Sequence, residues 1–201
     1  MPMPASASLI HMTNLSKTYA MGGRSLDVLD ALTFSVHAGD FIAVMGPSGS
    51  GKSTLLNILG CLDRATAGTY LLEGIDISNA SDDRLSEIRG RTFGFVFQSF
   101  HLIDNLNVYD NVTMPFLYAP AAPANIHKKT VQAIESVDWP IGCSTIPMNF
   151  PGGEMQRVAI ARAIVNQPKT ILADEPHGKL RFGYRHRHYE TAQNLNRNGT
   201  T

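Results

Sequence analysis

The feature that most constrains this chain is a glycine-rich run, GPSGSGKST, at residues 46–54, directly after the apolar residues 41–45. We expect a buried strand at residues 41–45, then this loop, then a helix over residues 52–62. In that arrangement the backbone N–H groups of the loop and the positive end of the helix dipole face the same position. This arrangement predicts a phosphate-binding loop, in which Lys52 reaches the β- and γ-phosphates and the Ser53 hydroxyl completes the shell of a Mg²⁺ ion. The residues expected to bind the phosphates are Gly46, Pro47, Ser48, Gly49, Ser50, Gly51, Lys52, Ser53 and Thr54. A flexible Gly/Ser connection is the alternative, which the flanking elements disfavour.

The composition narrows the possible partners. The 201 residues suit one large domain, and 17 Lys and Arg balance 17 Asp and Glu, so no bulk charge attracts nucleic acid or an anionic membrane. Cys61 and Cys143 are too few for a disulfide framework, and Cys61 is expected to be a small core residue. No apolar run approaches the ~20 residues of a membrane span. We therefore expect no nucleic-acid partner, and contact with a membrane only through another protein.

Strand and helix signals alternate along the chain. Predicted strands cover residues 9–12, 28–36, 41–45, 71–72, 93–97 and 170–173, and predicted helices cover residues 52–62, 82–89 and 153–165. Residues 108–134 are helical in pattern but interrupted by Pro115, Pro120 and Pro123, which predicts an inserted helical lobe at about 99–166. This alternation predicts an α/β fold with a mostly parallel sheet and a ligand beyond the carboxyl ends of its strands.

An acidic pair follows the last predicted strand. Asp174 is expected to hold Mg²⁺ through its water shell, and Glu175 to polarise a water molecule that attacks the γ-phosphate. Taken alone, such a pair more often marks an ordinary exit from a strand. The glycine-rich loop earlier in the chain favours the catalytic interpretation.

Further motifs give the chain a resemblance to the ATP-binding subunit of ABC transporters, over almost its whole length. Residues 46–54 resemble the Walker A motif and residues 171–176 the Walker B motif. Gln98 occupies the position of the Q-loop glutamine, which in that family ligates Mg²⁺ and senses the membrane partner. Tyr19 resembles the aromatic residue that stacks on adenine, although a strand-edge tyrosine is the simpler reading of that residue alone. Residues 152–163, GGEMQRVAIARA, resemble the signature helix.

The resemblance implies a function and a fold. Gly152, Gly153 and Glu154 would contact the ATP held by the other subunit of a head-to-tail homodimer, and this dimer would drive a separate membrane permease. Lys52, Gln98 and Glu175 would be catalytic, with ATP and Mg²⁺ bound. The implied fold is that of a P-loop NTPase, with an N-terminal antiparallel β subdomain and an inserted helical subdomain, in one domain over residues 1–201. The subunit would be cytoplasmic and peripheral on the inner face of the cell membrane. Residues 55–64 resemble the lipoprotein-release and macrolide-export branch in particular.

Three departures from the family pattern affect this expectation. Pro151 stands where the family has a signature serine, and it has neither a hydroxyl nor an N–H group to offer a phosphate. After Pro176 the family continues TGNLD, whereas this chain reads HGKLR, so that Arg181 replaces an aspartate. The chain also ends before the strand that leads to the family's switch histidine. We therefore expect a cassette truncated at its C-terminus, with weak hydrolysis and poor solubility.

Compensated frameshifts offer one explanation of the altered stretches. Codons permitted for residues 177–189, shifted by one base, encode TGNLDSVTGIAIM, and codons permitted for residues 144–151, read two bases along, encode HHPNELSG. On this hypothesis the RHRH run at residues 185–188 is an accident of reading frame and not a metal or phosphate site.

Two other functions stay open at this point. One is a module that binds ATP but hydrolyses it poorly, because Pro151 and Arg181 disturb the site shared between subunits. The other is a soluble P-loop ATPase of DNA maintenance, which would separate its two halves by a long coiled coil. The absence of sustained heptads disfavours the second function.

Overall fold

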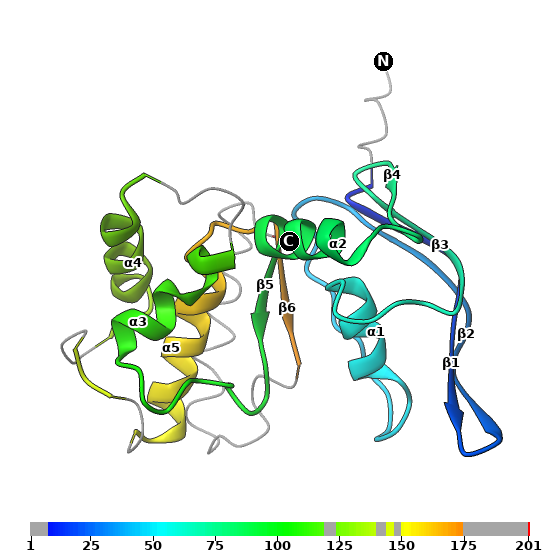
Figure 1. The fold of residues 1–201 in the computed structure, drawn as a ribbon, viewed down its shortest axis with the longest axis horizontal. Coiled ribbons are helices and arrows are strands. Elements are labelled where there is room, and N and C mark those ends of the chain that lie inside the picture. The colour runs from blue at the N-terminus through cyan, green and yellow to red at the C-terminus, as the bar shows by residue number, and fades with distance from the viewer. Residues whose placement is uncertain (1–7, 119–123, 140–143, 147–149, 175–200) are drawn as a thin grey trace. The chain divides into compact units, whose positions relative to one another are not determined.

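The computed structural model describes residues 8–118, 124–139, 144–146, 150–174 and 201. The chain divides into two compact units, residues 1–85 together with residue 201, and residues 86–200 (Figure 1). Among the described residues, the first unit contains a four-stranded sheet and the second a two-stranded sheet. The protein is therefore a mixed α/β structure, with one antiparallel and one parallel sheet.

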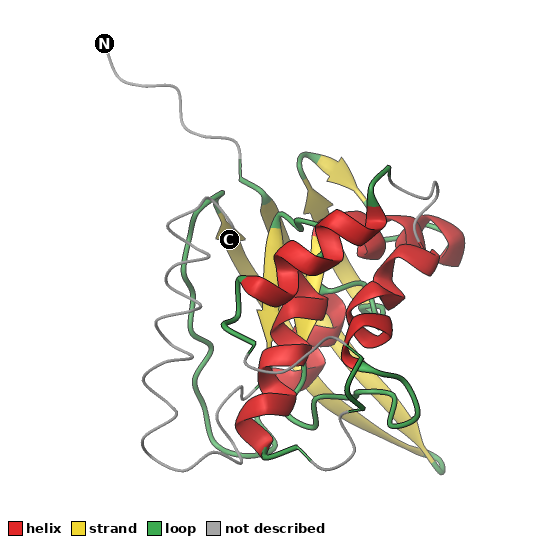
Figure 2. Ribbon diagram, turned by 90° about the vertical axis from the view of Figure 1, so that its left-hand side faces the viewer, coloured by secondary structure: helices red, strands yellow, loops and turns green. Residues whose placement is uncertain are grey.

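The sheet of the first unit is antiparallel throughout, in the order β2-β1-β3-β4. Its strands are β1 (Ile10–Met21), β2 (Arg24–Val36), β3 (Ala67–Leu72) and β4 (Ile75–Asp76). The long hairpin of β1 and β2 extends as a narrow ribbon (Figure 2). Gly22 and Gly23 form its turn with φ of 53° and 85°, a left-handed conformation that glycine adopts without strain. This part of the fold agrees with the predicted N-terminal antiparallel subdomain.

A bulge in β1 decides which of its side chains face inward. Met12 pairs with Phe34 and Leu15 with Leu32, so β1 contains one extra residue in this interval, and Asn14 there has φ of 50°. Before the bulge Ile10 and Met12 are buried, and after it Leu15 and Lys17 are buried. Because alternate residues share a face of a strand, the bulge brings Lys17 to the inner side of β1.

Helix α1 (Lys52–Leu59) follows the glycine-rich run and buries Leu55, Ile58 and Leu59. The helix ends at Gly60 because Cys61 adopts φ of 57°, and the N–H groups of Cys61 and Leu62 turn back onto the last carbonyls of α1. The sequence predicted a helix that continued to residue 62, which is one turn too long. Cys61 is buried, as predicted.

The predicted strand at residues 41–45 was wrong. These residues form no strand, and Phe41, Ile42 and Met45 are 50%, 53% and 89% exposed. An apolar run indicates that the side chains of a segment favour burial. A strand also needs a neighbouring strand whose backbone groups form hydrogen bonds with its own. Among the described residues, residues 41–45 pair with no strand.

The second unit combines a parallel strand pair with helices. Helix α2 (Asp82–Thr92), whose residues 82–85 belong to the first unit, begins after Ser81, and it leads into β5. The Ser81 hydroxyl oxygen accepts a bond from the Arg84 N–H at 3.2 Å. The other elements are β5 (Phe93–Val96), α3 (Val108–Thr113), the 3₁₀ helix η1 (Met114–Tyr118), α4 (Ile126–Glu135), α5 (Gly152–Ile164) and β6 (Thr170–Ala173). Pro115 lies in η1, where the α-helical pattern breaks, as predicted; Pro120 and Pro123 lie outside the described residues.

The core of the second unit forms where α5 meets α3, α4 and β5. Its buried residues are Val96, Val108, Val112, Phe116, Ala133, Ile134, Val137, Val158, Ile160, Ala161, Ala163 and Val165. Burial of this apolar set is the main source of stability for the helices, which are too short to persist alone. Helix α5 therefore occupies the centre of this unit, and the predicted helix over residues 153–165 is confirmed to within one residue at each end.

Candidate functional site

The glycine-rich run forms a loop that leads directly into α1. Gly51 is the N-cap residue of α1 with φ of 86°, and Gly49 has φ of 81°. A Cβ atom at Gly51 would lie 2.8 Å from the carbonyl oxygen of Val28, which is closer than Cβ atoms approach in proteins. Glycine is therefore required at position 51 by both the backbone conformation and the contact with β2, and it sets the direction in which α1 begins.

The start of α1 presents hydrogen-bond donors to solvent. The Leu55 N–H donates to the Gly51 carbonyl at 2.8 Å. The N–H groups before Leu55 have no acceptor within the helix, as at every helix N-terminus, and the helix dipole is positive there. Residues 46–50 are exposed, so an anion in solution can reach these donors.

The Lys52 ammonium group lies over the same loop. Its Nζ donates to the carbonyl oxygens of Gly46 at 3.0 Å and Pro47 at 2.9 Å. Both acceptors are neutral, and a phosphate oxygen would be a charged and stronger acceptor for the same group. Ser53, the next residue, is exposed. The donors, the positive charge and the close-packed glycine fit the phosphate groups of a nucleotide.

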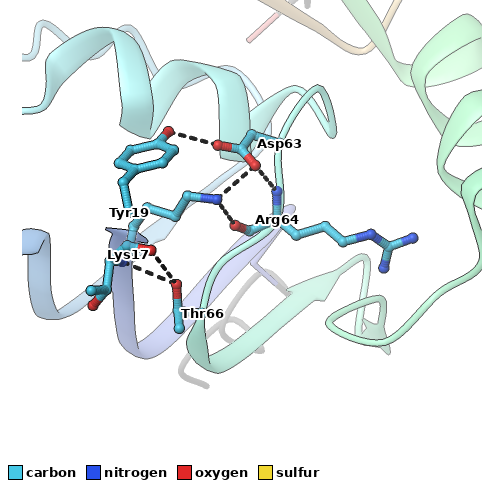
Figure 3. A network of polar contacts seen from close by, with 6 residues as sticks. Lys17, Tyr19, Asp63, Arg64 and Thr66 are labelled. Atoms are coloured by element: carbon cyan, nitrogen blue, oxygen red, sulfur yellow. Dashed lines mark hydrogen bonds and ion pairs between the residues drawn. The ribbon is translucent and has the colours of Figure 1, made fainter. Parts of the chain in front are cut away.

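Tyr19 lies beside α1, in a polar network that sequence reasoning did not identify (Figure 3). The Tyr19 hydroxyl donates to Oδ2 of Asp63 at 2.7 Å. Lys17 Nζ stands 4.6 Å from the centre of the Tyr19 ring. The bond to the Asp63 carboxylate is the largest cause that raises the pKa of the Tyr19 hydroxyl. The structure therefore fixes this tyrosine through its hydroxyl as well as its ring.

Asp63 is the centre of this network. Its Oδ1 accepts from Lys17 Nζ at 2.7 Å and from the Arg64 N–H at 2.7 Å. Burial raises the pKa of the Asp63 carboxyl, but the hydrogen bonds from Lys17, Tyr19 and the Arg64 backbone together outweigh it and lower the pKa. Asp63 is therefore held in its charged form. No sequence pattern pointed to this network.

In the second unit, Gln98 and Asp174 follow the carboxyl ends of two paired strands. β5 and β6 pair in parallel up to Val96 and Ala173, and the Asp174 N–H donates to the Val96 carbonyl at 3.0 Å. The Gln98 side chain is exposed and Asp174 is half-buried. Glu175, the predicted catalytic carboxylate, lies outside the described residues.

The predicted signature residues open α5. Gly152, Gly153 and Glu154 form its first turn, and Pro151 is the N-cap residue, which contributes no side-chain hydrogen bond. The Glu154 N–H donates to the Pro151 carbonyl at 2.8 Å. Serine would add a capping oxygen at this position, whereas proline adds neither an acceptor side chain nor an N–H group.

Arg162, near the other end of α5, is a second residue that sequence reasoning missed. Its guanidinium group donates to the carbonyl oxygens of Phe100 at 2.6 Å and His101 at 2.5 Å. Burial lowers the pKa of Arg162. Phe100 and His101 have φ of 58° and 47°, so the arginine stabilises a left-handed turn that begins two residues after Gln98.

Each unit thus brings together part of the predicted set. The loop at residues 46–54 and Tyr19 meet at α1 in the first unit. Gln98 and Asp174 follow neighbouring strands in the second unit, which also contains residues 152–154. Within the described ranges, no group of three or more His, Cys, Asp and Glu side chains could hold a metal ion. In those same ranges, no helix is long and apolar enough to cross a membrane.

Sequence comparisons agree with these motifs. The chain is 46% identical over 172 residues to an uncharacterized ABC transporter ATP-binding protein, YknY, of Bacillus subtilis, with 86% of this chain and 75% of that protein covered. It is 45% identical over 176 residues to the macrolide export ATP-binding/permease protein MacB of Brucella melitensis, with 88% of this chain and 27% of that protein covered.

A comparison with solved structures finds the same fold. The dimeric post-hydrolysis structure of the ATP-binding cassette MJ0796, bound to ADP and Pi, aligns with a TM-score of 0.87 at 36% identity. The alignment covers 96% of this chain and 85% of that one. The ABC transporter family itself matches residues 29–178, a range that includes the glycine-rich loop, Gln98, the start of α5 and Asp174. The chain therefore belongs to the ABC transporter family, as one of its ATP-binding ATPase domains.

Proposed function

We propose that this chain is the ATP-binding and ATP-hydrolysing subunit that powers a separate membrane permease. The observation that carries the proposal is the loop at α1, where Lys52 Nζ lies over two loop carbonyls at the positive end of a helix. The relatives are titled ATP-binding proteins, or ATP-binding proteins joined to permeases, and the similar solved structure holds ADP and Pi. These titles support the same function for this chain.

The proposed roles follow from the chemistry of each residue. Lys52 and the N–H groups of residues 46–54 bind and neutralise the phosphates of ATP, and Tyr19 stacks on the adenine. Ser53, Gln98 and Asp174 hold Mg²⁺, which when bound neutralises charge on the phosphates. Glu175 orients and polarises the attacking water molecule.

The proposed assembly is a head-to-tail homodimer. In it, Gly152, Gly153 and Glu154 of one copy contact the ATP bound by the other copy, at the positive end of the α5 dipole. The similar solved structures are titled as dimers, which supports this arrangement. We further propose one nucleotide-binding domain over residues 1–201 with a helical lobe at about 99–166, located on the cytoplasmic side of the membrane and bound to the permease.

The test is ATP binding by the full chain, measured by titration calorimetry with Mg²⁺. Lys52→Ala removes a charged donor to phosphate, worth about 1.5–3 kcal/mol, so the affinity for ATP should fall about 10- to 100-fold. Lys128→Ala is the matched control, because Lys128 is an exposed lysine of α4. Equal affinities of the wild-type chain and Lys52→Ala would overturn the phosphate-binding role.

One observation favours a second candidate, a module that binds ATP but hydrolyses it poorly. Pro151 caps α5 without a side-chain hydrogen bond, at the residue expected to face the γ-phosphate of the other copy. On this candidate, wild-type turnover stays well below the order of 1 s⁻¹ and Pro151→Ser raises it. Fast turnover by the wild-type chain that Glu175→Gln abolishes would instead support the first candidate.

A further inference from the structure

The network around Asp63 connects the end of α1 to the side chain of Tyr19. The Tyr19 hydroxyl donates to Oδ2 of Asp63, in the turn after the last residue of α1 (Figure 3). Both residues belong to the first unit, as does α1. The orientation of the tyrosine ring is therefore coupled to the helix that begins at the glycine-rich loop.

Lys17 restricts the ring from one side. Its Nζ stands 4.6 Å over the ring centre and donates to Asp63 Oδ1 and to the Arg64 carbonyl, each at 2.7 Å. The Lys17 side chain is 11% exposed and the Asp63 side chain 31% exposed. A cation over the ring is attracted to its electron density, so Lys17 helps to hold the ring in place. The carboxylate in turn satisfies a lysine that would otherwise carry an unpaired charge in a nearly buried position.

From these contacts we infer that Asp63 is a positioning residue for base recognition, which holds the Tyr19 ring ready to stack on the adenine of ATP. Asp63 acts through the Tyr19 hydroxyl and does not touch the nucleotide. The inference rests on the proposed function, because it assumes that ATP binds at the adjoining loop. Preorganising an aromatic ring improves affinity by reducing the conformational freedom that is lost on binding.

A purely structural role for the ion pair is the competing explanation, and the ligands of the test are chosen to separate the two. ATP has both base and triphosphate, whereas inorganic tripolyphosphate offers only the phosphate contacts. A residue that positions the base-stacking ring should affect only the affinity for ATP. Substituting a residue that merely supports the fold should lower the affinity for both ligands, because the phosphate-binding loop would be disturbed as well.

Three variants of the full chain break the bond between the Tyr19 hydroxyl and the Asp63 carboxylate in different ways. Tyr19→Phe keeps the ring and the Lys17–Asp63 ion pair but removes the hydroxyl, so it is the variant least able to disturb folding. Asp63→Ala removes the acceptor, and Asp63→Asn keeps an acceptor oxygen without the charge. Asp76→Ala is the control, because the Asp76 carboxylate is in the same unit but bonds Ser78, away from this network.

Tyr19→Phe and Asp63→Ala should each weaken ATP binding about 3- to 10-fold, the value of one hydrogen bond, with tripolyphosphate affinity changed less than about twofold. Asp63→Asn should recover part of the loss. In the Tyr19→Phe background, Asp63→Ala should have little further effect on ATP, because both changes break the same link. Asp76→Ala should bind both ligands as the wild-type chain does.

Two results would overturn the inference while leaving the function intact. One is that the wild-type chain binds ATP and that Tyr19→Phe and Asp63→Ala bind it with the same affinity. The other is an equal loss of ATP and tripolyphosphate affinity. If the wild-type chain binds neither ligand, the proposed function is wrong, and this inference falls with it.

Discussion

The contact between β5 and α5 gives a steric prediction at Gly94. A Cβ atom at this position would lie 2.3 Å from the Ala163 carbonyl oxygen and 3.0 Å from both the Ala163 carbonyl carbon and Pro168 Cγ. Two of these three atoms belong to the backbone at the end of α5, which is packed in the core of the second unit and cannot swing aside. Gly94→Ala must therefore separate β5 from α5 or distort one of them.

The expected cost lies at the upper end of the range for overpacking, about 3 kcal/mol. That is a large share of the roughly 5–15 kcal/mol that stabilises a typical domain. In a chain of this length each kcal/mol shifts the midpoint of thermal unfolding by about 2–4 °C, so Gly94→Ala should lower it by roughly 6–12 °C.

Circular dichroism during heating and urea titration measures this change. Gly90→Ala is the matched control, since a Cβ there meets only the Tyr118 carbonyl oxygen, at an ordinary 3.6 Å. Gly90 lies inside α2, where alanine favours the helix by about 1 kcal/mol, so the control should be neutral or slightly more stable. A loss below about 1 kcal/mol for Gly94→Ala would refute the argument that the backbone of α5 cannot yield.

Two further predictions concern the polar side chains of Asn111 and Asp63. Asn111 is fully buried, accepts from the Ile103 N–H and donates to the carbonyls of Ile103, Leu106 and Asn107, so Asn111→Leu should cost about 2–4 kcal/mol by urea denaturation. A change within about 0.5 kcal/mol would show that these groups find other partners. The pKa of Asp63 is lowered from 3.8, so its charge stabilises the fold above that pH and the stabilisation is lost as pH falls toward the lowered pKa. The free energy of unfolding of wild type minus that of Asp63→Asn should therefore be largest near neutral pH and shrink below pH 3.8; a difference that stays constant down to pH 2.5 would contradict the charge-based explanation.

The sequence predicted those helices and strands whose signals lie within a short stretch of residues. Short-range preferences account for the start of α1 at Lys52 and for the strands around residues 93–97 and 170–173. Residues 41–45 failed because a strand depends on a partner elsewhere in the chain, and apolar composition does not identify that partner.

The limits of prediction at the site have the same physical origin. The glycine-rich loop could be identified because its glycines and Lys52 are adjacent in sequence. Asp63 could not, because its link to Lys17 and Tyr19 spans more than forty residues and depends on the bulge in β1 that turns Lys17 inward. Likewise, nothing in residues 152–163 indicated that Arg162 would bond two carbonyls about sixty residues earlier.

The bonds of Arg162 have a mechanical consequence. The Arg162 guanidinium group bonds two successive carbonyls, and it thereby ties the turn at Phe100 and His101 to the last turns of α5. From Arg162 back to Gly152 the helix is about 15 Å long at 1.5 Å per residue, and a packed helix transmits displacement along its axis with little bending. A displacement of the segment after Gln98 would therefore also displace the first turn of α5.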